Sequence, residues 1–308
     1  MTTPETAQDD ARRIAITGAT GLIGGALSEA FRADGYTIQK VSRSRPDTEL
    51  DVQWSPTDGQ IEADKLEGVD VVIHLAGENI FGLWTENKKQ KILASRAQGT
   101  GLIAKTIAGL DRPPSTFISA SGVDFYGDAG SQEVDETSPP GDTFLAEVCQ
   151  VWEAACQPAA DAGIRTLNTR MGAVLSKDGG ALSLMLKPFK FGLGGQVGSG
   201  DQYMSWVSHR DVARAMRFLV DDTELAGPIN LTSPNPVTNE VFTKTLARVL
   251  GRPALFDLPT FMVKLGGGQM AKELLLSGTR AVPRRLQESG FEFEYAELEA
   301  ALQNELNQ

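Results

Sequence analysis

The sequence predicts an α/β fold, in which a doubly wound parallel sheet is followed by a smaller, mainly helical C-terminal lobe. Short apolar runs alternate with helical patterns over about the first 170 residues, which is the rhythm of repeated βαβ units. A glycine-rich turn follows the first apolar run, Ile14-Ala15-Ile16, and opens a helix that ends near Arg32. After Leu175 the chain becomes rich in glycine, and later in helix formers and proline. We therefore expect one sheet domain and one smaller lobe.

The remaining elements follow in order from hydrophobic periodicity. Val69 to Leu75 is almost wholly apolar, as a strand buried on both faces should be. The other expected strands are Tyr36 to Val41, Ser115 to Ala120, Arg165 to Leu175 and Pro228 to Leu231. Two expected helices are Glu86 to Leu110 and Phe144 to Ala162. The segment Trp206 to Asp211 leads into a third expected helix, which ends at Asp221. Because the strands are expected to run parallel, a ligand should bind at their carboxyl ends.

The domain boundaries follow from this order. Residues 11–175 plus 205–232 should form the sheet domain, and residues 176–204 plus 233–308 the lobe on the substrate side. In the lobe, apolar residues recur at helical spacing, namely Phe242, Leu246, Val249 and Leu250. We expect this lobe to close over the substrate cleft, the alternative being a surface helix unrelated to it.

Composition excludes several classes of function. The net charge of -11 argues against a nucleic-acid surface, which needs clustered Lys and Arg. The first twelve residues have no apolar signal core, and no run of about 18 apolar residues occurs, so we expect a cytoplasmic protein without membrane partners. Cys149 and Cys156 are too far apart on one helical stretch to bridge. The two histidines, His74 and His209, have no metal-ligand spacing, so no metal is expected.

The glycine turn predicts a binding site for a dinucleotide. Gly18, Gly21 and Gly24 stand in the motif Thr17-Gly18-Ala19-Thr20-Gly21-Leu22-Ile23-Gly24. The first glycine permits a tight turn, the second lets the backbone approach a pyrophosphate, and the third lets the helix pack close to the strand. Within the motif, Thr20, Leu22 and Ile23 are further candidate cofactor residues. A plain tight turn is the alternative interpretation.

The whole chain resembles an extended short-chain dehydrogenase/reductase, which implies a Rossmann-type fold and a nicotinamide cofactor. The resemblance rests on the glycine turn, His74-Leu75-Ala76-Gly77, Ser119-Ala120-Ser121 before Tyr126-Gly127, and Trp206 to Asp211. Other segments resemble one atypical branch, labelled epimerase-family, sugar-nucleotide epimerase-like or cell-division-inhibitor-like, which has its own C-terminal domain of unknown function. These segments include Ala76 to Ile80, Pro139 to Asp142, Phe144 to Cys149 and Val282 to Leu286.

The end of the second expected strand indicates which dinucleotide is bound. An NAD enzyme of this fold normally has Asp or Glu there, whereas this chain has Val41-Ser42-Arg43-Ser44-Arg45. Arg43 can pair with a 2′-phosphate and stack on adenine, and Ser42 can add a hydroxyl. We therefore predict NADP(H), the alternative being a solvated basic turn. Ser42 and Arg43 also match the cofactor positions of the resembling branch.

Four further residues are candidate cofactor contacts. Leu75 and Ala76 end the strand that should pass the adenosine. Arg96, on the following helix, is the next basic group expected to face the cofactor, although it can equally be a surface charge. Ala173, with Gly172 before it, ends the strand expected under the nicotinamide, where small residues would let the ring lie close.

The usual acid of the superfamily is missing. Its reductases use a Tyr hydroxyl, a Lys four residues on and a Ser, but this chain has Phe144 and Val148 at the Tyr and Lys positions. Ser121 matches the Ser, so we expect it to hold the substrate oxygen while Tyr126 acts as a replacement acid with a pKa near 10. Tyr126 can instead be a packing residue.

Minor candidates complete the site. Glu147 is a weaker candidate acid, and His209 is expected to be structural. Met204 stands where sugar-nucleotide enzymes carry an Arg for the substrate phosphate, and with Trp206 and Phe189 it can line a more apolar pocket.

Three functions remain open at this point. The first is an NADP(H)-dependent oxidoreductase acting on a small molecule that the sequence does not identify. The second is a nucleotide-sugar epimerase or dehydratase, and the third is an NADP(H)-binding regulatory protein without turnover. The oligomeric state stays open.

Overall fold

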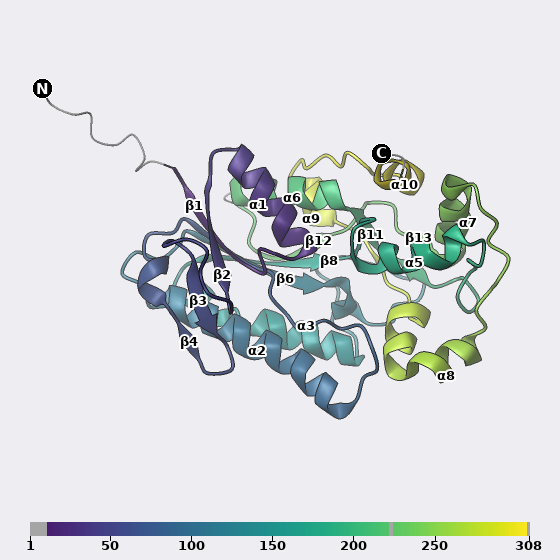
Figure 1. The fold of residues 1–308 in the computed structure, drawn as a ribbon, viewed down its shortest axis with the longest axis horizontal. Coiled ribbons are helices and arrows are strands. Elements are labelled where there is room, and N and C mark those ends of the chain that lie inside the picture. The colour runs from purple at the N-terminus through teal and green to yellow at the C-terminus, as the bar shows by residue number, and fades with distance from the viewer. Residues whose placement is uncertain (1–10, 222–223, 307–308) are drawn as a thin grey trace, which may run out of the picture.

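The computed structural model describes residues 11–221 and 224–306 and is built around one eight-stranded sheet. All neighbouring strands are parallel except the last pair, β3 and β4. From β1, the strand order runs to β2 and β3 on one side and to β5 and β6 on the other, so it reverses between β1 and β5 (Figure 1). In spatial order the strands are β12 (Gly227–Leu231), β8 (Arg165–Met171), β6 (Thr116–Gly122), β5 (Val71–His74), β1 (Arg13–Thr17), β2 (Thr37–Ser42), β3 (Val52–Ser55) and β4 (Gln60–Ile61).

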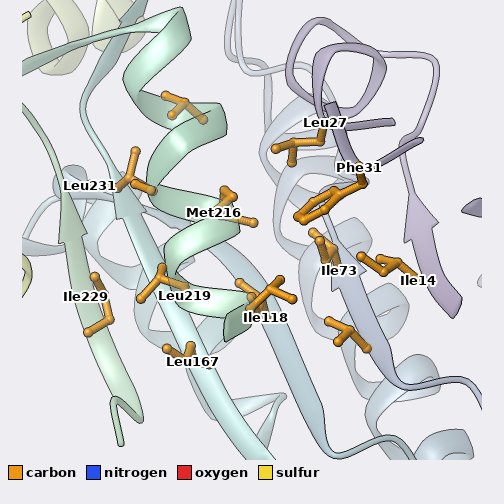
Figure 2. Packing of buried hydrophobic residues seen from close by; sticks show 14 of the residues in the cluster. Ile14, Leu27, Phe31, Ile73, Ile118, Leu167, Met216, Leu219, Ile229 and Leu231 are labelled. Carbon is orange, nitrogen blue, oxygen red and sulfur yellow. The ribbon is translucent and has the colours of Figure 1, made fainter. Parts of the chain in front are cut away.

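Helices cover both faces of this sheet, as a doubly wound fold requires. On one face lie α1 (Leu22–Ala33) and α6 (His209–Asp221), and on the other α2 (Glu86–Ala108) and α3 (Phe144–Ala154). Helix α4 (Gln157–Asp161) packs beside α2 on that second face. The larger core lies under α1 and α6, where strand residues such as Ile14, Ile73 and Ile118 pack against Phe31 and Met216 (Figure 2). The apolar alternation of the first half of the chain is thus explained by burial on both faces.

The lobe has a core of its own. The lobe consists of α5 (Gly180–Lys190), α7 (Asn239–Leu250), α8 (Thr260–Ala271) and α10 (Leu298–Leu306), together with short strand pairs, and its core lies between α5, α7 and α10. Those pairs are β9 (Ala173–Leu175) with β11 (Trp206–Ser208), β10 (Tyr203–Met204) with β13 (Val237–Thr238), and β7 (Glu133–Val134) with β14 (Arg280–Ala281). The remaining short helices are η1 (Ala63–Leu66), η2 (Val123–Tyr126), η3 (Lys272–Leu276) and α9 (Arg284–Glu288).

Two expected elements are each divided in the structure. The helix expected from Phe144 to Ala162 is two helices, because Pro158 near the start of α4 cannot continue the hydrogen-bond ladder of α3. The strand expected from Arg165 to Leu175 breaks at Gly172, where a Cβ would lie 2.6 Å from the Ser205 oxygen. Beyond Gly172, β9 leaves the main sheet and pairs with β11.

The C-terminal tail differs from the expected lobe boundary. Leu286 and Phe291 are buried in the core of the sheet domain, and α9 packs against β12. The chain therefore returns to the sheet domain before α10 rejoins the lobe. A deletion of everything after Pro253 would remove part of the main core as well as the lobe.

Within the part of the chain that the structure describes, no helix is both long and apolar enough to cross a membrane. In residues 11–221 and 224–306, no group of three His, Cys, Asp or Glu side chains is placed to hold a metal ion.

Candidate functional site

The turn between β1 and α1 is shaped by close backbone contacts. Gly18 has a φ of +70°, and a Cβ on it would lie 3.2 Å from the Ala76 nitrogen at the end of β5. The Gly21 N–H donates to the Gly18 oxygen at 2.9 Å and closes the turn. A Cβ on Gly24 would lie only 2.2 Å from that same oxygen. Helix α1 therefore begins directly against the turn, and its N-terminus faces the carboxyl ends of the strands.

A buried pair holds the turn against β5. The Thr17 hydroxyl accepts hydrogen bonds from the N–H groups of Leu75 and Ala76 at 3.0 and 3.1 Å. Its own proton is then available for His74 Nδ1, which is 2.8 Å away. Burial lowers the pKa of His74 to about 3, with the charge of Arg96 adding to the effect, so the ring is neutral and can accept that proton.

A cavity of about 940 Å³ opens in front of this turn. Its walls come from the turn, the end of β2, the end of β5 and one face of α2. Seven of the predicted cofactor residues line it, namely Gly18, Thr20, Gly21, Ser42, Arg43, Leu75 and Ala76. Residues that are distant in the sequence thus meet at the point where the strand order reverses, which is where this class of sheet binds ligands.

The acidic side chains of this cavity are all engaged. Asp51 accepts hydrogen bonds from the backbone N–H groups of Lys40, Asp47 and Thr48. Asp47 pairs with Lys40 at 2.7 Å, and Glu78 pairs with Lys88 at 2.7 Å.

The cations of the cavity are arranged differently. Arg43, Arg45 and Lys91 line it without an ion-pair partner among residues 11–221 and 224–306. The end of β2 therefore presents positive charge, and no free carboxylate opposes it.

The other predicted cofactor residues do not line this cavity. Leu22 lies against Gly179, and Ile23 packs on the main core. Gly24 is buried beneath the turn, and Ala173 packs on the core of the lobe. The motif therefore combines residues that face the cavity with residues that hold its shape.

Arg96 was expected to face the cofactor, and the structure corrects this. Its side chain is only 8% exposed, and its Nη1 donates to the carbonyl oxygens of Glu78 and Ile92 at 2.9 and 3.3 Å. Its guanidinium lies 4.8 Å from the Trp152 ring centre and close behind Gly77. Arg96 thus supports the Gly77-Glu78 wall from behind, because its long side chain turns inward from α2.

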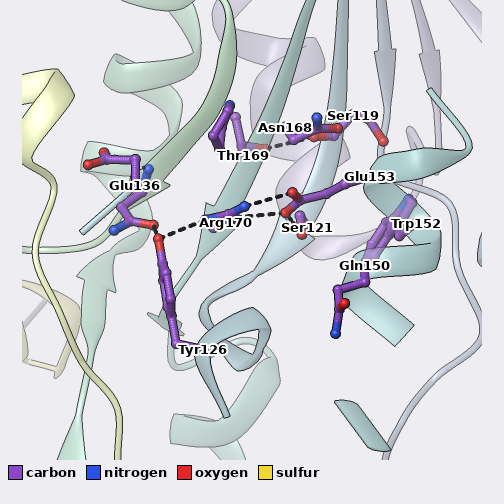
Figure 3. A network of polar contacts seen from close by, with 12 residues as sticks. Ser119, Ser121, Tyr126, Glu136, Gln150, Trp152, Glu153, Asn168, Thr169 and Arg170 are labelled. Atoms are coloured by element: carbon purple, nitrogen blue, oxygen red, sulfur yellow. Dashed lines mark hydrogen bonds and ion pairs between the residues drawn. The ribbon is translucent and has the colours of Figure 1, made fainter. Parts of the chain in front are cut away.

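Ser121 and Tyr126 belong to a buried polar network (Figure 3). The Tyr126 hydroxyl donates to Asn230 Oδ1 at 2.7 Å and accepts from Arg170 Nη1 at 3.0 Å. Arg170 forms a two-point ion pair with Glu153, with both distances 2.8 Å. The Ser121 hydroxyl donates to Glu153 Oε1 at 2.7 Å.

This placement corrects the expectation for Tyr126. The side chain is 4% exposed, and burial raises the pKa of its hydroxyl to about 12 rather than leaving it near 10. Neither Tyr126 nor Ser121 lines the cavity described above. Because both hydroxyls are committed to protein partners, the geometry supports a structural role for them.

We expect Tyr126→Phe to lower the free energy of unfolding by about 1–3 kcal/mol, because Arg170 and Asn230 would each lose a buried partner. Urea unfolding of the two proteins measures this. NADPH affinity, followed by intrinsic fluorescence, should stay unchanged. An unchanged unfolding free energy would contradict the structural role.

The Tyr and Lys positions of the superfamily are occupied by packing residues. Phe144 and Val148 lie in an apolar cluster with Trp84, whose ring meets that of Phe144 edge to face at 5.1 Å. Glu147 is exposed on the same helix. The usual proton-transfer pair is therefore replaced by a hydrophobic contact between α3 and the loop before α2.

The expected apolar pocket walls are also corrected. Trp206 is fully buried and Phe189 is 6% exposed, and both belong to the core of the lobe together with Met204. His209 has a structural placement, with Nε2 3.4 Å from the Leu22 oxygen. Sequence reasoning passed over Asp124, which lies in η2, two residues after the end of β6. The signal that could have found it is an acid near the carboxyl end of a strand.

Taken together, the parallel sheet, the glycine turn and a cavity at the reversal of strand order define a dinucleotide-binding fold of the Rossmann type. Comparison with known proteins specifies the family. Residues 14–231 match the model of the NAD dependent epimerase/dehydratase family, and residues 258–305 match a domain of unknown function (DUF1731). The chain belongs to this epimerase/dehydratase family.

Relatives cover nearly the whole chain. An epimerase family protein of Mycobacterium leprae is 39% identical over 290 residues, which is 94% of both chains. Human epimerase family protein SDR39U1 is 34% identical over 294 residues, covering 94% of this chain and 98% of the human one. A crystal structure of human SDR39U1 (isoform 2) with NADPH superposes with a TM-score of 0.88 over 96% of this chain and 99% of that chain. A nucleoside-diphosphate sugar epimerase from Corynebacterium glutamicum, at 34% identity, gives 0.81 over 96% of this chain and 58% of that chain.

Proposed function

We propose that this chain binds NADPH in the 940 Å³ cavity and acts as an oxidoreductase on a small carbonyl or alcohol compound. The observation that carries the proposal is the end of β2, where Ser42 and Arg43 line the cavity and every nearby carboxylate is already engaged. A 2′-phosphate finds an exposed guanidinium there and no free acid to repel it. The human relative crystallised with NADPH supports the same cofactor.

The rest of the cavity fits a dinucleotide. The turn at Gly18 to Gly21 and the N-terminus of α1 offer backbone N–H groups to a pyrophosphate. Leu75 and Ala76 offer backbone and small apolar surface to the adenosine. When bound, NADPH supplies a hydride to an acceptor carbon.

A nucleotide-sugar substrate is the less favoured alternative. Met204, at the position of the phosphate-binding Arg, packs on the core of the lobe and brings no charge. Phe144 and Val148 replace the Tyr and Lys that such epimerases use.

Replacing Arg43 by Ala tests the cofactor. We expect the wild-type chain to bind NADPH at least tenfold more tightly than NADH, because charge-assisted hydrogen bonds contribute about 1.5–3 kcal/mol. The variant should lose most of this preference and keep its NADH affinity. Titration by intrinsic fluorescence measures the dissociation constants of NADPH and NADH.

Arg252→Ala is the matched control, since Arg252 is exposed and does not line the cavity. The control should leave both affinities unchanged. Equal affinities of the wild-type chain for the two cofactors, or an unchanged ratio in Arg43→Ala, would refute the assignment.

A further inference from the structure

Asp124 lies outside the residues that line the 940 Å³ cavity, on the side toward which the second half of a bound dinucleotide should extend. It is the second residue after β6, which neighbours β5 on the side of the sheet away from β2. The cavity places the 2′-phosphate end at β2 and the pyrophosphate at the turn after β1. A dinucleotide lies across the reversal of strand order, so its nicotinamide half extends toward the ends of β5 and β6.

The chain leaves room for the Asp124 carboxyl group at this strand end. A Cβ on Gly122 would lie 3.0 Å from Asp124 Oδ2 and 3.6 Å from the Cys149 sulfur. The carboxyl group thus occupies the space that a side chain at position 122 would take. Asp124 is only partly buried, and among the described residues no hydrogen bond or ion pair joins its carboxyl group to another side chain.

Three titratable or charged groups face Asp124 from the elements around it. They are Arg96 on α2, Cys149 on α3 and Glu273 on η3. Glu273 accepts hydrogen bonds from the N–H groups of Phe144 and Leu145 at 3.3 and 3.0 Å, so η3 is attached to the N-terminus of α3 beside the site. Loss of solvation raises the pKa of Asp124 to about 6; Glu273 adds to the rise and Arg96 opposes it.

We propose that Asp124 is the proton-transferring residue beside the nicotinamide, in place of the hydroxyl acid that is missing at Phe144. This inference rests on the proposed NADPH binding. Asp124 gives its carboxyl proton to the carbonyl oxygen of the substrate while the carbonyl carbon receives a hydride from NADPH. The products are the alcohol and NADP⁺, and the Asp124 carboxylate regains a proton from water. In the oxidation direction, the carboxylate takes the hydroxyl proton instead.

The same surroundings narrow the substrate class. A substrate anion at this position would face both Asp124 and Glu273, with Arg96 committed behind the Gly77-Glu78 wall. Phe144 and the neighbouring apolar cluster lie next to Glu273. The site therefore suits a neutral carbonyl compound with an apolar body.

Comparing NADP⁺ with NADPH tests the position of Asp124 without a substrate. The two cofactors differ only in the nicotinamide ring, which is positively charged in NADP⁺. The ratio of their dissociation constants therefore reports only on the surroundings of that ring. In the wild-type chain, NADP⁺ should tighten relative to NADPH as pH rises from about 5 to about 8, because Asp124 ionises and attracts the ring. In Asp124→Asn the ratio should not change with pH, and at pH about 8 NADP⁺ should bind roughly three- to tenfold more weakly relative to NADPH.

Two further measurements separate this role from a structural one. Glu288→Gln, which removes an exposed acid on α9, should keep the wild-type ratio at every pH. Asp124→Asn should raise the melting temperature above pH about 6, since the folded chain no longer holds an ionised carboxylate at a site with poor solvation. A carboxylate with a merely structural role would leave the variant less stable.

Each other outcome counts against the inference. An unchanged NADP⁺ to NADPH ratio in Asp124→Asn, or equal weakening of both cofactors, would show that Asp124 does not face the ring. Failure of the wild-type chain to bind either cofactor would instead refute the proposed function, and this inference with it.

Discussion

Replacing Glu153 by Ala is expected to lower the free energy of unfolding by about 3–5 kcal/mol. The side chain of Arg170 is 4% exposed and that of Glu153 is 13% exposed, and the two form a two-point ion pair at 2.8 Å. Loss of the carboxylate leaves a buried guanidinium beside the Tyr126 hydroxyl and over the rings of Phe125 and Tyr126, whose centres are 3.4 and 5.1 Å away. A buried charge without its partner is among the most destabilising changes in a folded chain.

An exposed pair provides the matched control for urea unfolding. Lys244 and Glu240 lie four residues apart on α7 with side chains 68% and 45% exposed, so Glu240→Ala should change stability by less than about 1 kcal/mol. The double variant Glu153→Leu/Arg170→Met should recover part of the loss, because it removes both charges. A loss of less than about 1 kcal/mol in Glu153→Ala would mean that the pair stabilises no more than an exposed one.

The network explains why a catalytic hypothesis for Tyr126 was reasonable from sequence and yet is not favoured by the structure. A Ser at the end of β6 and a Tyr five residues later are the local signal. The partners that commit the Tyr126 hydroxyl are 44 and 104 residues away in the chain, on β8 and β12. No local pattern reveals such partners.

The residues that line the cavity were more predictable because their determinants are local. The glycine turn and Leu75-Ala76 directly follow strands and Ser42-Arg43 stands at the end of one, and parallel strands bring their carboxyl ends together. The positions of the main strands and helices along the chain likewise followed from apolar periodicity, which burial imposes, whereas the strand order came only from the structure. Arg96 was misplaced because periodicity does not show whether a long side chain on a helix turns outward or inward.

The path of the C-terminal tail likewise could not be predicted from periodicity alone. Its helical composition predicted a lobe, but Leu286 and Phe291 pack in the core under α6. Only tertiary contacts distinguish a helix of the lobe from one that returns to the sheet. The surroundings of Asp124 also depend on this return path, since Glu273 reaches α3 from the C-terminal segment.

Replacing Gly24 by Ala is expected to weaken the binding of NADPH and NADH alike, by more than about tenfold. The new Cβ would lie 2.2 Å from the Gly18 oxygen and 2.9 Å from the Ala19 Cα, both backbone atoms that cannot rotate away. Helix α1 must then move off the turn, and its N–H groups no longer converge on the pyrophosphate. The strain should also lower the free energy of unfolding by about 1–3 kcal/mol.

The adjacent glycine makes this prediction specific. A Cβ on Gly25 would meet nothing closer than the Ala19 oxygen at 3.9 Å, so Gly25→Ala should bind both cofactors normally and be up to about 1 kcal/mol more stable. Fluorescence titration of the two variants distinguishes this effect from that of Arg43→Ala, which changes the ratio of NADPH to NADH affinity rather than both affinities together. Wild-type affinities in Gly24→Ala would show that the contact between helix and turn is not what positions the cofactor. A loss in Gly25→Ala as large as in Gly24→Ala would show that the close contact at Gly24 is not what weakens binding, because a Cβ on Gly25 meets the turn only at an ordinary contact distance.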